Sequence, residues 1–171
     1  MRFIPPADEG FDEERYRGPA YRAYSWMATV SEIVYHPATY TIEPKRIWNV
    51  IDAGRLINRA VAEGQAEGGV IQALGYALTE LCYRKGFGRI QGFTDYALPM
   101  SLDIPEIDIE FLFDDSREAK GLGEIPMNCP AASIRNALHD ATGAFINRIP
   151  LTPEVVMQHM TGRHQGSSWN T

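Results

Sequence analysis

YSWMATVSEIVY (residues 24–35) and TYTIEPKRIWNVIDAG (residues 39–54) are the two stretches that decide the fold of this chain. Both are rich in the β-branched and aromatic residues that favour strands. A turn is expected between them at His36-Pro37-Ala38. The two stretches therefore predict a hairpin or a meander.

A proline interrupts the second stretch. Because proline cannot donate to a strand ladder, two short strands are expected there, over 39–43 and 46–51, with a break near Pro44. The sequence Asp52-Ala53-Gly54 closes the second of them.

The spacing of apolar residues changes to a helical period over residues 60–85. Apolar side chains recur at steps of one, three and four from Val70 to Cys82, which predicts one buried helical face. Glycine costs up to ~1 kcal/mol in a helix, so the helix is expected to begin near Gly68. The glycines of this stretch, Gly64, Gly68, Gly69 and Gly75, are expected to allow close approach of another backbone or of a ligand.

The rest of the chain predicts one strand and two helices. Residues 107–113 alternate, which predicts a strand with one buried face. Pro130 suits the first residue of a helix that Gly143 ends, and Thr152 suits the N-cap of a last short helix. Strands and helices interleave without a strict βαβ order, so the fold class is predicted as α+β, with mixed sheets and packed helices.

Composition excludes several classes of protein. The chain has 171 residues, 44% of them hydrophobic, and a net charge of -6, which argues against nucleic acid as a partner. No apolar run is long enough to span a bilayer, so no membrane association is expected. Cys82 and Cys129 form no CxxC pair, so a zinc site or an iron–sulfur cluster is not expected, and reduced thiols suit a cytoplasmic protein.

Three segments are expected along the chain: an N-terminal arm over 1–23, a folded domain over 24–160 and a polar tail over 161–171. The arm carries prolines and glycines that discourage regular structure, together with several aromatic residues. Those aromatic residues suit an arm that lies on a partner chain. A tail folded back on its own domain remains the alternative.

A lone carboxylate stands in AKGLGEIPMNCPAAS, residues 119–133. Gly121 and Gly123 remove side-chain bulk around Glu124, and its apolar neighbours predict a setting that raises the pKa of the carboxyl. Lys120 is expected either to hold the loop or to offset that charge. A general base is one interpretation of Glu124; a glutamate at a turn before a helix is the other.

A second candidate is the glycine-rich stretch around Gln65, in RAVAEGQAEGGVIQ, residues 59–72. A glycine-rich entry to a helix exposes backbone N–H groups that suit an anionic ligand such as a phosphate or a pterin side chain. Close packing of two elements through small residues is the alternative. The spacing matches neither a P-loop nor a dinucleotide-binding fingerprint.

Taken together, the motifs resemble the C-terminal part of the molybdopterin-binding subunit of the xanthine dehydrogenase/aldehyde oxidoreductase family of molybdenum hydroxylases. The resemblance covers about residues 24–157. Its motifs, in order along the chain, are Asp52-Ala53-Gly54 with Ile57-Asn58, Gly64-Gln65-Ala66-Glu67-Gly68-Gly69, Gln72-Ala73-Leu74-Gly75, Asp95-Tyr96-Ala97-Leu98-Pro99, Lys120-Gly121-Leu122-Gly123-Glu124-Ile125-Pro126, Pro130-Ala131-Ala132 with Asn136-Ala137, Asp140-Ala141-Thr142-Gly143 and Pro150-Leu151-Thr152-Pro153-Glu154.

The resemblance implies roles for particular residues. Glu124 matches the family's catalytic base, which takes a proton from a hydroxyl on molybdenum as the oxygen attacks an electron-poor carbon of an aldehyde or an N-heterocycle. Gln65 matches a glutamine that contacts the cofactor, and Gly121, Leu122 and Gly123 match the residues flanking the site. No side chain is expected to bind the metal directly, because the pterin dithiolene does.

The resemblance also implies partners. Family molybdopterin subunits are several times longer, and their other cofactor loops have no counterpart here. Some members split this subunit into two polypeptides, and Met1 followed by an aromatic-rich arm is expected to start the smaller piece. We therefore expect a larger molybdopterin-binding subunit, an iron–sulfur subunit with 2Fe-2S clusters, a flavin subunit with FAD, a dinucleotide form of the molybdopterin cofactor and a small-molecule substrate.

Two other functions remain open at this point. One is a non-catalytic structural or assembly homologue of the same domain, which the intact Glu124 argues against. The other is an independent small-ligand binding protein that uses residues 64–69.

Overall fold

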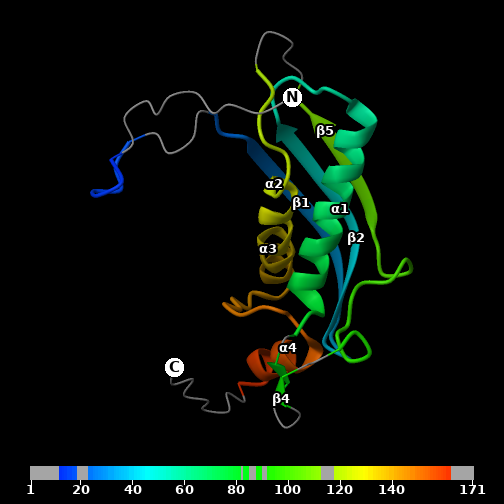
Figure 1. Cartoon of the computed structure of the whole chain (residues 1–171). Coiled ribbons are helices and arrows are strands. Elements are labelled where there is room, and N and C mark those ends of the chain that lie inside the picture. The colour runs from blue at the N-terminus through cyan, green and yellow to red at the C-terminus, as the bar shows by residue number, and fades with distance from the viewer. Residues whose placement is uncertain are drawn as a thin grey trace.

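A three-stranded sheet with helices packed against one of its faces forms the body of the molecule (Figure 1). The computed structural model describes residues 12–18, 23–81, 83–84, 88–89, 92–112 and 118–162. Strand order is β1-β2-β5, and a separate pair, β3 (Tyr83–Arg84) and β4 (Gly88–Arg89), is antiparallel. The strands thus form a mixed sheet and the helices pack against it, which confirms the α+β prediction.

The expected hairpin is present. Strand β1 (Trp26–His36) pairs antiparallel with β2 (Thr41–Asp52), and the Tyr40 backbone N–H donates to the His36 carbonyl at 2.7 Å across the turn. Strand β5 (Glu106–Phe111) then pairs with β2 in parallel. Because parallel neighbours need a long connection, all of α1 and the segment after it lie between β2 and β5.

The expected break at Pro44 is wrong, because β2 runs through it. Ile33 pairs with Pro44 while Glu32 pairs with Arg46, so Lys45 is an extra residue in a β-bulge. Strand β5 pairs with β2 only from Arg46 onward, so Pro44 lies where β2 has one neighbouring strand. A proline is tolerated there because the bulge and the free side remove the need for its missing N–H.

Helix α1 (Arg59–Leu78) begins nine residues before the expected Gly68. The Asn58 side chain accepts from the Val61 backbone N–H at 3.2 Å and caps the helix. Ala62 and Ala66 are buried in its first half. Burial of this small-residue face stabilises the early turns, and this outweighs the poor helix propensity of the glycines there.

The later elements confirm their predictions. Helix α3 (Pro130–Thr142) starts at Pro130 after the one-turn helix α2 (Ile125–Asn128), and Gly143 ends it with φ +73°. Thr152 caps α4 (Pro153–Met160), accepting from the Val155 N–H at 3.4 Å. None of the helices in the described parts of the chain is long and apolar enough to cross a membrane.

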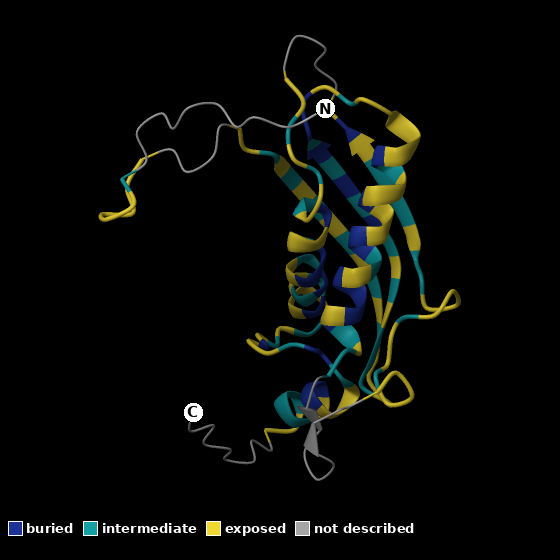
Figure 2. Cartoon of the chain, viewed as in Figure 1, coloured by how far each residue is buried: buried dark blue, intermediate teal, exposed yellow. Residues whose placement is uncertain are grey.

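The core has two clusters between the sheet and the helices (Figure 2). The larger includes Ile47 of β2, Val70 of α1 and Ile134 of α3. The smaller contains Ile51, Ala53, Ala62, Ala66 and Phe111. It lies where β2 and β5 end and α1 begins, so it supports the chain that follows β5.

The predicted arm and tail fall mostly outside the described residues. Within 12–18, Asp12 and Arg17 form a backbone bridge around a turn. Residues 1–11, 19–22 and 163–171 are not described, nor is Phe113 of the expected strand. The interpretations of the arm therefore both stay predictions.

Neighbouring glycines of α1 offer a matched test of how α2 packs. Gly68→Ala adds a methyl group in open space and should gain about 1 kcal/mol of stability from helix propensity. Gly69→Ala would place its Cβ 2.8 Å from Pro126 Cβ. Overpacking costs about 1–3 kcal/mol, so Gly69→Ala should be less stable than Gly68→Ala by that amount. Thermal unfolding of both variants measures the difference, and equal stability would show that α2 does not rest on α1.

Candidate functional site

The segment over residues 118–124, called the site loop below, runs past the end of β2. Gly54 forms an isolated antiparallel bridge with Ala119. It has φ +64°, and a Cβ built on it would lie 2.2 Å from the Glu118 carbonyl oxygen. Its N–H donates to Asp52 Oδ1 at 3.0 Å. The Asp52-Ala53-Gly54 turn therefore has a definite function, which is to let the site loop pass close by.

A nearly buried ion pair fixes the start of the site loop. Lys120 Nζ lies 2.6 Å from Asp52 Oδ2, and the two side chains are only 12% and 13% exposed. The Lys120 backbone N–H also donates to the Ala53 carbonyl at 2.9 Å. Of the two roles considered for Lys120, the structure therefore shows that it holds the loop.

Two side-chain hydrogen bonds hold the middle of the site loop. Ser25 Oγ, just before β1, donates to the Gly121 carbonyl at 2.5 Å. Gln65 Nε2, on α1, donates to the Gly123 carbonyl at 2.7 Å. Between these points Leu122 packs against the smaller core cluster. The four residues predicted to bind cofactor are thus brought together, although they come from segments far apart in sequence.

Glu124 follows directly and is exposed. It occupies the N-cap position of α2, but its side chain makes no cap hydrogen bond to the helix. The apolar setting expected from Leu122 and Ile125 does not form around the carboxylate, because both side chains pack into the core cluster instead. The described residues therefore hold the backbone of Glu124 firmly and leave its side chain on the surface.

The glycines of this region divide into two groups. A Cβ built on Gly69 or Gly75 would collide with Pro126 or Glu80. A Cβ built on Gly64, Gly68, Gly121 or Gly123 would meet nothing within 4 Å. Close packing within the chain therefore explains only the first group. The second group leaves bare backbone around Gln65 and Glu124, where another molecule can approach closely.

One expectation about Gln65 is wrong. Because α1 begins at Arg59, the 64–69 stretch lies inside the helix, where backbone N–H groups are bonded four residues back. Those N–H groups cannot bind an anion as a helix N-terminus would. Gln65 reaches the site with its side chain. Among the residues that the structure describes, no three His, Cys, Asp or Glu side chains gather as a metal site.

Sequence reasoning did not assign a role to Ser25 or Asp52, which hold the site loop. Asp52-Ala53-Gly54 was recognised as a motif that closes a strand, and its spacing to Lys120 carries no signal of contact across 68 residues. Ser25 lies in an ordinary polar position before a strand. Only the fold brings both residues to the loop.

Comparisons with known proteins identify the family to which this chain belongs. A family model described as "Molybdopterin cofactor-binding domain" matches residues 2–105. The xanthine dehydrogenase molybdenum-binding subunit of Escherichia coli O157:H7 is 38% identical over 126 residues, which is 68% of this chain and 17% of that protein. The subunit gamma of the 6-hydroxypseudooxynicotine dehydrogenase complex of Paenarthrobacter nicotinovorans is 33% identical over 149 residues, 81% of this chain and 19% of that protein.

A solved structure shares the fold. The aldehyde oxidoreductase of Desulfovibrio gigas matches with a TM-score of 0.71 and 29% identity, over 80% of this chain and 15% of that one. The chain belongs to the molybdopterin-binding domain family of the xanthine dehydrogenase and aldehyde oxidoreductase type of molybdenum hydroxylase, as its motifs predicted. It spans about a fifth of the length of the curated relatives it matches, and Glu124 lies beyond the residues that the family model covers.

Lys120→Met keeps the length of the side chain but leaves the Asp52 carboxylate buried without its cation. Breaking a buried pair in this way costs about 3 kcal/mol or more, and we expect the low end because both side chains keep some solvent contact. Urea unfolding measures the loss, and deuterium exchange at the Lys120 amide should speed up. The double variant Asp52→Asn/Lys120→Met leaves no buried charge and should recover most of the stability. Unchanged stability of Lys120→Met would contradict the role of the pair.

Proposed function

We propose that this chain is the small subunit of a split molybdenum hydroxylase, and that Glu124 is the general base in hydroxylation of an aldehyde or of a carbon in an N-heterocycle. The observation that carries the proposal is the site loop. It presents the exposed carboxylate of Glu124 on a backbone fixed by Ser25, Gln65, Asp52 and Ala53, beside glycines with open space around them. The names of the relatives support these substrate classes, since they include xanthine and aldehydes.

The residues present fit a molybdopterin cofactor as a group that approaches bare backbone. Four glycines leave room that no side chain of the described chain fills, and Gln65 lies among them with a polar side chain. When bound, the cofactor supplies the oxygen-transfer and electron-accepting chemistry. Gln65 and the backbone of Gly121, Leu122 and Gly123 would line its site, and Glu124 would take up the proton released as the substrate carbon is hydroxylated.

A fixed backbone with a free carboxylate suits a general base. The side chain must reach a proton within about 2.6–3.2 Å, directly or through one water, in the bound state. Preorganisation of the loop removes the cost of ordering it when substrate binds. A covering chain would exclude water from the carboxylate, which the described residues leave exposed.

The proposal includes partners and a location. Relatives that carry this domain are about five times longer, which supports a larger molybdopterin-binding chain as the other part of the site. Subunits with 2Fe-2S clusters and FAD would carry electrons away, and the cofactor would be the dinucleotide form. We place the complex in the cytoplasm. A non-catalytic homologue of the domain is the alternative, and the exposed Glu124 on a fixed loop favours the catalytic proposal.

Glu124→Gln should leave assembly and molybdenum content unchanged and lower turnover by about 10²–10⁴-fold, because the amide cannot take a proton. Steady-state kinetics and metal analysis of the complex, purified after co-expression with the neighbouring reading frames, measure both. Glu118→Gln, in the same loop, is the matched control and should turn over normally. Normal turnover by Glu124→Gln in a molybdenum-loaded complex would favour the non-catalytic alternative.

Gln65→Ala tests cofactor binding separately from catalysis. It removes the side chain that lies between α1 and the Gly123 carbonyl, so the complex should retain less molybdenum, while Glu124→Gln retains it fully. Gln72→Ala is the control, since Gln72 is exposed two helical turns further along the same side of α1. Equal molybdenum content in all three variants would remove Gln65 from the site.

A further inference from the structure

The face of the sheet opposite the helices, called the outer face below, is not uniform. Strand pairing places Trp26, Ala28 and Val30 of β1 on this face with Trp48 and Val50 of β2. Trp26 is 70% exposed and Val30 is 63% exposed. Helices α1 and α3 lie on the other face (Figure 1), so no described helix covers these side chains. The outer face therefore carries an apolar half along β1 and β2.

The other half of the same face is polar. Glu106, Asp108 and Glu110 of β5 point to it, as expected for a sheet face that meets water. Arg46 bonds to Asp108 through two nitrogens, at 2.6 and 3.1 Å, and lies over the Trp48 ring. Its guanidinium holds the pKa of the Asp108 carboxyl below its usual value. Arg46 also lies 3.5 Å from Glu106, so two of the three carboxylates in this half are already paired with a cation of the same chain.

The apolar half lies along β1, which is an edge strand of the described sheet. Natural edge strands are usually protected by charged residues or by a covering element. Along β1 the outer face instead carries Trp26, Ala28, Val30 and Val34, interrupted by Glu32. An exposed apolar patch of this kind marks an interaction surface.

We infer that the apolar half of the outer face, Trp26, Ala28, Val30, Trp48 and Val50, is the surface on which the larger part of the molybdenum-binding polypeptide docks. This inference rests on the proposed function. In the relatives compared above, the matched region is 15–19% of one polypeptide, so most of each protein lies outside it. An apolar surface with two tryptophans suits a permanent interface of that kind.

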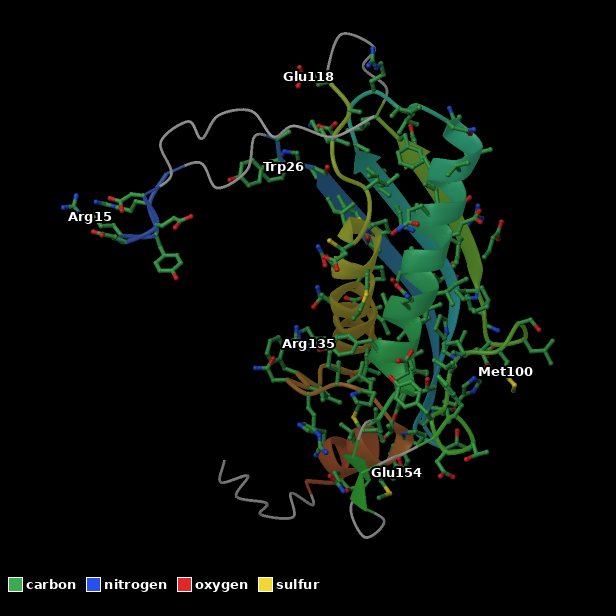
Figure 3. The ribbon with its side chains drawn as sticks, in the orientation of Figure 1. Arg15, Trp26, Met100, Glu118, Arg135 and Glu154 are labelled. Carbon is green, nitrogen blue, oxygen red and sulfur yellow. The ribbon has the colours of Figure 1, made fainter. Side chains whose placement is uncertain are left out.

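The position of the patch supports the same occupant. Trp26 follows Ser25, whose hydroxyl bonds to the Gly121 carbonyl in the site loop. Trp26 and Glu118 accordingly lie toward the same end of the molecule, away from Met100 (Figure 3). A chain that covers Trp26 is therefore adjacent to the loop that presents Glu124, where the rest of the cofactor site must come from.

Val30→Asp tests the inference in the complex co-expressed with the larger molybdenum-binding chain. We expect at least a tenfold loss of affinity between the two chains, measured by titration of the purified variant. Met100→Asp is the matched control, because Met100 is 68% exposed and lies outside the outer face. It should assemble like the wild type. Circular dichroism and thermal unfolding of each free variant check that the fold is kept. Normal assembly of Val30→Asp would overturn the inference.

Acrylamide quenching of Trp26 identifies what covers the patch. In a Trp169→Phe background, the two remaining tryptophans, Trp26 and Trp48, both belong to the patch. Trp26, which is 70% exposed, should be strongly quenched in the free chain, and the tryptophan emission should be protected several-fold by the larger chain. Protection in the free chain that is lost on removing residues 1–22 would assign the patch to the chain's own arm. Protection that rises with its own concentration, with dimers in ultracentrifugation, would assign it to a second copy. Either result overturns the inference.

The outcomes separate this surface from the proposed function. If Glu124→Gln abolishes turnover in a molybdenum-loaded complex while Val30→Asp assembles normally, the function stands and the docking surface is wrong. If Val30→Asp prevents assembly but the wild-type complex holds no molybdenum, the surface stands and the proposed function is wrong.

Discussion

The carboxylate of Asp52 is the constraint on which the arrangement of the site depends. One oxygen accepts from the Gly54 N–H and shapes the turn that ends β2, while the other binds Lys120 of the site loop. This nearly buried carboxylate thus joins the central strand to a segment 68 residues away in sequence. A carboxylate with so little solvent contact is costly without its partners, so the loop has one favoured position against the strand. That position determines where Glu124 lies.

The two faces of the sheet have different surroundings. On the inner face, α1 and α3 bury the core, and Gln65 extends from α1 to the Gly123 carbonyl. On the outer face, the apolar half along β1 lies beside the polar half along β5. The chain at the start of β1 serves both, since Ser25 bonds to the site loop and the next residue, Trp26, lies on the outer face. Assembly and catalysis would then meet at one end of one strand.

Local signals in the sequence predicted the hairpin, the strand before the site loop and the caps of α3 and α4, because turn residues, alternation and capping act over a few positions. They failed where packing over longer distances decides. Pro44 was expected to break a strand, and the bulge at Lys45 accommodates it. Gly68 was expected to start α1, and burial of Ala62 and Ala66 extends it to Arg59. Motifs identified the family and the candidate residues, but the bonds to Ser25 and Asp52 required the fold.

The bulge in β2 has a further consequence for the tolerance of this domain to changes in length. Before Lys45 the even-numbered Ile42 faces the helices, and after it the odd-numbered Ile47 and Ile51 do so. The extra residue therefore changes which positions of β2 face the helices, from even-numbered residues before it to odd-numbered residues after it. Loss of this one residue would restore a regular alternation in which Ile42, Ile47 and Ile51 still face the helices. Gain of a further residue would instead need a second irregularity, or would turn one part of β2 inside out. The stretch between Ile42 and Ile47 should therefore tolerate the loss of one residue better than the gain of one.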